Sequence, residues 1–76
     1  MNPDRLVAMA NDIANFFAGE SDRQAAAAGV ANHLSRFWEP RMRRQIVEYY
    51  KSGGRGLSEV ARAGVEQLGE MGSEVI

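Results

Sequence analysis

The sequence predicts an all-α fold, a small bundle of three to four short helices in which the first two form an antiparallel hairpin. Apolar residues recur at intervals of three and four along most of the chain, and no stretch alternates with period two as a half-exposed strand would. A length of 76 residues leaves room for one hydrophobic core only. We therefore expect residues 1–76 to form a single small domain.

The first helix is expected to begin at Asn2-Pro3-Asp4 and to end near Ala18-Gly19. Asn is a favourable N-cap, Pro is tolerated at the first helical position, and Asp suits the positive end of the helix dipole. We expect Gly19 to take the left-handed conformation that commonly closes a helix. The spacing places one set of apolar residues on its buried face: Leu6, Met9, Ala10, Ile13, Phe16 and Phe17.

The second helix is expected to open with a capping box at Ser21-Asp22-Arg23-Gln24, in which the Ser and Gln side chains bond to each other's backbone amides. The small side chains of residues 25–29 allow another backbone to approach closely. The short preceding loop favours antiparallel packing against the first helix. Its expected buried face consists of Ala26, Ala27, Val30, Leu34, Phe37 and Trp38.

A proline should end the second helix and begin a third, expected from Pro40 to about Lys51. The apolar stripe of this third helix consists of Met42, Ile46, Tyr49 and Tyr50.

A glycine-rich break at residues 53–56 should precede a weaker fourth helix, with Ser58 as its cap. Its apolar positions are Leu57, Ala61, Gly64, Leu68 and Met71. Three glycines, at positions 64, 69 and 72, lower the helix propensity of this segment. We therefore expect residues 72–76 to form a tail that is frayed or is ordered only by a partner.

The composition excludes several classes of site. The chain has no cysteine and a single histidine, so it offers no thiolate for an iron–sulfur cluster or a zinc site. One histidine among scattered carboxylates provides no nucleophile with a base and an orienting group, and the glycines at 53–56 follow no strand and precede no Gly-Lys-Ser/Thr motif. We expect no catalytic, cofactor-binding or metal-binding residues in this chain.

The charge is small overall but unevenly placed. The formal net charge is −1, divided into −2 over residues 1–32, +4 over residues 33–55 and −3 over residues 56–76. This balance argues against nucleic acid as the main partner. No apolar run approaches the roughly 18 residues of a membrane span, and no cationic leader precedes an apolar segment, so we expect a cytoplasmic protein with no membrane partner.

The corner between the second and third helices is the most distinctive segment. Its arginines occupy the first turn of a helix, where cations oppose the dipole. Two interpretations stay open at this point: the arginines are solvated or paired with Glu39 or Glu48, or they face a carboxylate or phosphate surface of a partner. The candidate partner-interface residues are Trp38, Pro40, Arg41, Arg43, Arg44, His33 and Tyr50.

His33 lies one step from the apolar face of the second helix. Such a histidine is most simply explained as a half-buried side chain with one hydrogen-bond partner, because no other metal ligands stand at a suitable spacing.

Several motifs, in order and spacing, resemble one known family. They are Met9-Ala10-Asn11 with Ile13 and Phe16-Phe17, Ala31-x-His33, Phe37-Trp38-x-Pro40-Arg41-Met42-Arg43, and Gly53-Gly54-x-Gly56-Leu57. Together they resemble the delta subunit of cytoplasmic NAD-dependent formate dehydrogenase. Glu39 agrees with the acidic residue usual between Trp and Pro in that family, whereas Ser58-Glu59 stands where the family often has a proline.

This resemblance implies a non-catalytic accessory subunit that binds no cofactor itself. In such complexes the alpha subunit carries a molybdenum or tungsten bis-pterin guanine dinucleotide and iron–sulfur clusters, and the beta and gamma subunits carry FMN and further clusters. The hypothesis is that the chain binds and stabilises the catalytic alpha subunit through the Trp38–Arg44 corner. Two alternatives stay open: a maturation chaperone for insertion of the pterin guanine dinucleotide, and a self-associating helical module that forms a homodimer when isolated.

Overall fold

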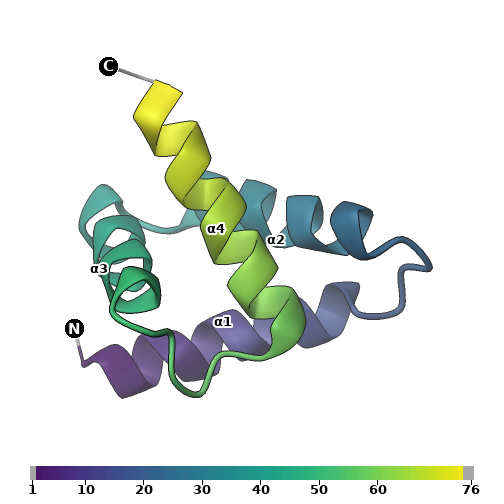
Figure 1. The fold of residues 1–76 in the computed structure, drawn as a ribbon, viewed down its shortest axis with the longest axis horizontal. Coiled ribbons are helices and arrows are strands. Elements are labelled where there is room, and N and C mark those ends of the chain that lie inside the picture. Colours follow the sequence, from purple (N-terminus) through teal and green to yellow (C-terminus); the bar gives the residue numbers. More distant parts are fainter. Residues whose placement is uncertain (1, 75–76) are drawn as a thin grey trace.

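The structure, a computed structural model, describes residues 2–74, and within this range it contains helices and no strand. The helices are α1 (Pro3–Phe17), α2 (Arg23–Phe37), α3 (Pro40–Lys51) and α4 (Glu59–Glu74). In Figure 1, α1 runs toward the turn that joins it to α2, α2 returns from that turn, and α4 crosses over both with α3 beside it. The predicted all-α class is therefore confirmed.

The first helix begins as predicted and ends differently. The Asn2 side chain accepts a hydrogen bond from the backbone N–H of Asp4 at 2.9 Å, and Pro3 occupies the first turn. The prediction that Gly19 takes a left-handed conformation was wrong, since Gly19 has no positive φ. The helix is closed instead by Ala18, whose right-handed backbone lets its N–H donate to the carbonyl of Asn15.

The second helix is capped by Asp22 and not by Ser21. The Asp22 carboxylate accepts from the backbone N–H of Gln24 at 3.0 Å. With Asp22 as N-cap, Gln24 lies at the second helical position and Ala25 at the third, so no Gln or Glu stands where a capping box needs one. The predicted capping box was therefore wrong in its register.

Three glycines shape the connection from α3 to α4. Gly53, Gly54 and Gly56 have φ values of 132°, 62° and 90°, a region that side chains with a Cβ rarely adopt. The predicted cap of α4 is confirmed, because the Ser58 hydroxyl accepts from the N–H of Ala61 at 3.3 Å. Helix α4 continues to Glu74, and residues 75–76 of the predicted frayed tail lie outside the described residues.

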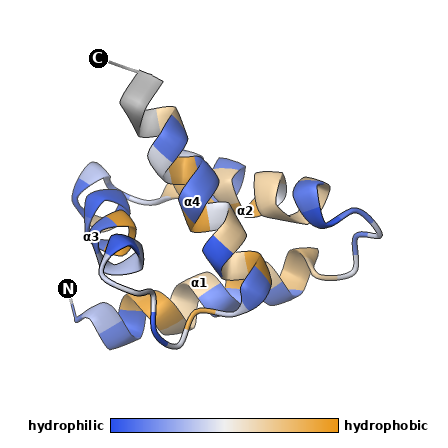
Figure 2. Ribbon diagram, viewed as in Figure 1, coloured by the Kyte–Doolittle hydropathy of each residue, from blue (hydrophilic) through white to orange (hydrophobic). Residues whose placement is uncertain are grey.

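The core lies where α2 and α4 pack together, with α1 and α3 completing it. A Cβ on Gly64 would come within 2.5 Å of Val30 Cγ1 and 3.3 Å of the Ala27 carbonyl oxygen, so the backbones of α2 and α4 lie close together here. The sequence predicted that another backbone would approach the small side chains of residues 25–29, and the helix that does so is α4. Figure 2 shows the apolar residues of α3 on the side toward α4. The buried core cluster consists of Leu6, Ala10, Ala14, Val30, Ala31, Leu34, Trp38, Ile46, Leu57, Ala61, Val65 and Leu68.

Two residues predicted on buried faces, Phe16 and Phe37, are exposed, and so is Met71, an apolar position of α4. Phe16, Phe37 and Met71 are 82%, 72% and 42% exposed. Phe16 packs edge-on against Phe17, which covers Gly29 of α2, so only the second of these two rings reaches a neighbouring helix.

Candidate partner-binding surface

Trp38 belongs to the core and not to the outer surface of the corner. The residue is 6% exposed and packs within the buried cluster. Its backbone is extended, with φ −88° and ψ 142°, so α2 ends before it, and the residue is buried as its spacing of four after Leu34 predicted. Trp38 therefore supports the corner from within.

Phe37 is the exposed aromatic of this corner. Its ring lies against the imidazole of His33 one helical turn earlier, with centroids 4.7 Å apart and planes inclined by 40°. His33 is half-buried, as expected, but the hydrogen-bond partner expected for it is not found among the contacts of residues 2–74. The helical period predicted Phe37 in the core, since it follows Leu34 by three residues, but its ring lies instead on the side of the helix that carries His33.

Arg43 is engaged within the fold. Its Nη1 donates to the carbonyl of Ser35 at 2.7 Å and to the carbonyl of Trp38 at 3.0 Å. These carbonyls belong to the last turn of α2 and its cap, where backbone acceptors lack helical partners and a cation is favourable. Arg43 thus joins α3 to the end of α2, which the two interpretations considered from sequence did not include.

Arg41, Arg44 and Pro40 are exposed on the first turns of α3. Within the described part of the chain, no ion pair joins these arginines to Glu39 or Glu48. Glu39, the N-cap of α3, makes no capping bond with its side chain. The internal pairing considered from sequence is therefore not formed by Arg41 or Arg44.

Tyr50 lies near the other end of α3 and contacts α4. Its hydroxyl donates to Glu66 Oε1 at 3.2 Å, and the guanidinium carbon of Arg62 lies 5.7 Å from its ring centroid. Partial burial, followed by the hydrogen bond to Glu66 and the charge of that carboxylate, raises the pKa of Tyr50 above 10.0. Arg62 also donates to the Gly54 carbonyl at 2.8 Å. Tyr50, which contacts Arg62, therefore helps to support the glycine turn.

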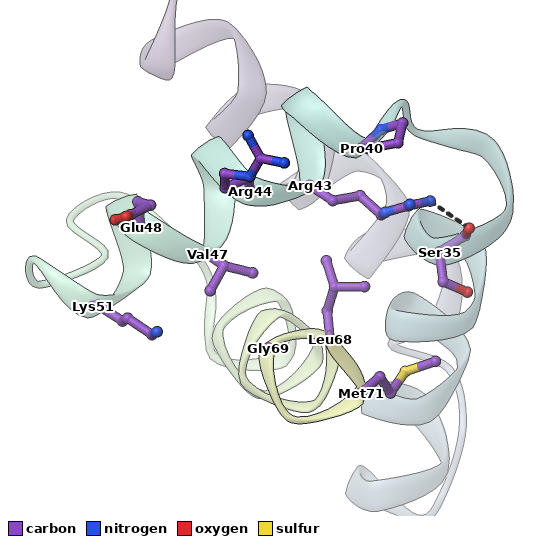
Figure 3. A pocket seen from close by; sticks show the side chains of 10 residues that line it. All are labelled: Ser35, Pro40, Arg43, Arg44, Val47, Glu48, Lys51, Leu68, Gly69 and Met71. Atoms are coloured by element: carbon purple, nitrogen blue, oxygen red, sulfur yellow. Dashed lines mark hydrogen bonds between the residues drawn. The ribbon is translucent and has the colours of Figure 1, made fainter. Parts of the chain in front are cut away.

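The structure thus separates the seven candidates. The exposed part of the corner consists of His33, Pro40, Arg41 and the newly found Phe37. The corner is supported from within by Trp38 and Arg43. Tyr50 is remote from the corner. Arg44 lies on the rim of an open groove of about 590 Å³ between α3 and α4. Figure 3 shows this groove, with Val47 of α3 and Leu68 of α4 inside it and Arg43 reaching across to Ser35. Its lining residues are Ser35, Pro40, Arg43, Arg44, Val47, Glu48, Lys51, Leu68, Gly69 and Met71.

The described residues contain neither a membrane-spanning helix nor a cluster of metal ligands. Over residues 2–74, no helix combines the length and the hydrophobicity needed to cross a membrane. In the same range, no three His, Asp or Glu side chains lie close enough together to hold a metal ion.

The chain is similar to a known protein family over most of its length. A family described as NADH-dependent formate dehydrogenase delta subunit FdsD matches residues 5–65 of the 76-residue chain. This range contains the helical corner, the glycine turn and the first part of α4. No curated protein and no solved structure matches the chain.

Proposed function

Because the chain belongs to the delta-subunit family of NADH-dependent formate dehydrogenases, we propose that it is a non-catalytic accessory subunit that binds the large catalytic subunit of that enzyme. Binding to the native catalytic subunit stabilises it by mass action, most usefully in its cofactor-loaded form. The chain acts in the cytoplasm, where the alpha, beta and gamma subunits assemble with it.

The observation that carries this proposal, beside family membership, is the exposed Phe37 at the α2–α3 corner. A phenylalanine that is 72% exposed, stacked on His33 and followed by Pro40 and Arg41, matches the aromatic and arginine composition of interface centres. Trp38 and Arg43 hold the corner rigid from beneath, so little side-chain or backbone freedom is lost on binding.

The redox groups belong to the partner subunits in this proposal. The chain has no cysteine, so it supplies no thiolate to an iron–sulfur cluster. The molybdenum or tungsten pterin cofactor and its clusters are placed in the alpha subunit, with FMN and further clusters in the beta and gamma subunits.

Co-purification with a tagged catalytic subunit tests the proposal. We expect Phe37→Ser to lower the amount of retained chain at least about tenfold, since truncation of a central aromatic commonly removes that much affinity. Phe16→Ser is the matched control, because Phe16 is 82% exposed and lies at the far end of α1. This control should be retained like the unaltered chain.

Two results would contradict this proposal. If the unaltered chain is not retained, and omitting it changes neither the cofactor content nor the formate activity of the complex, the accessory role is wrong. Equal loss of retention by Phe16→Ser and Phe37→Ser would place the contact elsewhere.

A further inference from the structure

The groove between α3 and α4 combines an apolar floor with a basic rim. Val47 and Leu68 supply the floor from the two helices, and Met71, 42% exposed, extends it toward the end of α4. Figure 3 shows Val47, Leu68 and Met71 along the groove and Lys51 at one end of it. An open apolar floor of this kind can receive a side chain from another molecule.

The charges on the rim are predominantly positive. Arg43, Arg44 and Lys51 line the groove with a single carboxylate, that of Glu48. Arg43 is held by the carbonyls of Ser35 and Trp38 and forms a fixed wall. Arg44 and Lys51 are exposed, and among the described residues neither makes an ion pair.

The positions of Arg44 and Lys51 on α3 define which kind of segment can fit the groove. Arg44 and Lys51 are seven residues apart, which places them on one face of the helix and about 10 Å apart along its axis. Val47 lies between them in sequence and borders the same groove. A complementary segment must present carboxylates at a similar separation, with an apolar side chain between them.

We propose that this groove binds an acidic, amphipathic segment of a partner protein. This inference rests on the proposed function, because it places the segment in the catalytic subunit. A helix with acidic residues seven positions apart and an apolar residue between them satisfies both the rim and the floor. A polyphosphate ligand fits less well, since the Glu48 carboxylate lies on the rim and an apolar floor offers no donors to phosphate oxygens.

A double charge reversal tests the groove. Arg44→Glu with Lys51→Glu should lower retention on the tagged catalytic subunit at least about tenfold, because opposite charges across an interface become like charges. The matched control is Arg5→Glu with Arg55→Glu, which makes the same change in net charge at two exposed residues outside the groove. Retention of the unaltered chain should also decline with added salt more steeply than that of the double variant.

A second variant tests the floor. Met71→Glu keeps both rim cations and places a carboxylate beside the expected apolar anchor, so it too should lower retention at least about tenfold. Circular dichroism of each variant verifies that the helices form. If the charge-reversed and Met71→Glu proteins fold and are both retained like the unaltered chain, the groove does not bind the partner, although the accessory function stands.

Two other results overturn the proposal in distinguishable ways. If the unaltered chain itself is not retained, the proposed function fails and the groove inference fails with it. If inorganic pyrophosphate shifts the NMR signals of Arg44 and Lys51 while added catalytic subunit leaves them unchanged, the groove is a phosphate site and not a peptide site.

Discussion

Arg43 is the side chain that connects α3 most directly to the end of α2 at the corner. One nitrogen of its guanidinium donates to two carbonyls, those of Ser35 and Trp38, at 2.7 and 3.0 Å. Both carbonyls lie at the end of α2, where no backbone donor follows in helical register. The arginine therefore replaces the missing helical partners and fixes the direction in which α3 leaves the corner.

Replacing this guanidinium should destabilise the whole domain. We expect Arg43→Met, which keeps the aliphatic stem, to lower the free energy of unfolding by about 1.5–3 kcal/mol through loss of charge-assisted hydrogen bonds. Arg41→Met should change it by less than about 0.5 kcal/mol, as is usual for an exposed surface residue. Urea unfolding of the two variants measures the difference, and equal values would show that the Arg43 bonds contribute little.

Tyr50 gives the domain a pH-dependent contribution to stability. Partial burial and the neighbouring Glu66 favour the neutral phenol, so the pKa of Tyr50 in the fold lies above the value of 10.0 for an ordinary tyrosine. For an acid whose pKa is raised by folding, the stabilisation is complete below the unfolded pKa and is lost as pH rises through the folded pKa. Stability should therefore fall as the pH rises above about 10.

The titration of tyrosinate absorbance in the ultraviolet checks this effect. Tyr50→Phe should remove the component that titrates at the higher pH, and Glu66→Gln, which removes the charge but keeps an acceptor, should shift that component to lower pH. If Glu66→Gln leaves the titration unchanged, burial alone raises the pKa.

At the scale of elements, a side chain of α1 holds the glycine turn between α3 and α4 in place. Asn11 donates from Nδ2 to the Gly56 carbonyl at 2.9 Å and accepts from the Ser58 N–H at 2.9 Å. Ser58 in turn caps α4. The amide of Asn11 therefore fixes where the fourth helix starts relative to the first.

Removal of this amide should loosen the turn. Asn11→Ala is expected to lower the free energy of unfolding by about 1–3 kcal/mol, because two hydrogen bonds are lost and the partly buried Ser58 N–H keeps no partner. Hydrogen exchange at the Ser58 amide should accelerate in the same variant. Asn15→Ala, an exposed change on the same helix, is the control, and equal exchange rates in the two variants would contradict the role of Asn11.

Helix starts were predictable from sequence because their causes are local. Asn2, Pro40 and Ser58 act on amides or backbone angles within a few residues of themselves. The choice between adjacent candidates was less certain: Ser21 and Asp22 can each cap a helix, and the register of the whole turn decides between them.

The candidate site was less predictable because it depends on distant contacts. The spacing of Trp38 after Leu34 predicted its burial, but the same helical pattern did not predict that Phe37 is exposed beside His33. The bonds of Asn11 join residues 45 and 47 positions apart. The basic character of the middle of the chain was visible in sequence, but the groove needed the packing of α3 against α4.

At the scale of the whole molecule, no helix has a core of its own. The largest fully buried side chains are contributed by all four helices, and they form one cluster: Leu6, Leu34, Ile46, Val30 and Val65. The radius of gyration of 11.1 Å agrees with the value of about 11 Å expected for a globular chain of this length. Loss of any one helix therefore exposes apolar surface on the helices that pack against it.

This shared core predicts a single cooperative unfolding transition. Trp38, which is 6% exposed and lies in the cluster, reports on tertiary packing through its fluorescence, while far-ultraviolet circular dichroism reports on all four helices. For a two-state domain the two signals should have the same urea midpoint. The free energy of unfolding should lie near the lower end of the usual range of about 5–15 kcal/mol, because so short a chain buries a smaller fraction of its surface than a longer domain does. A fluorescence midpoint that precedes the loss of helix would show that α3 and the corner separate from the α2–α4 pair before the domain unfolds.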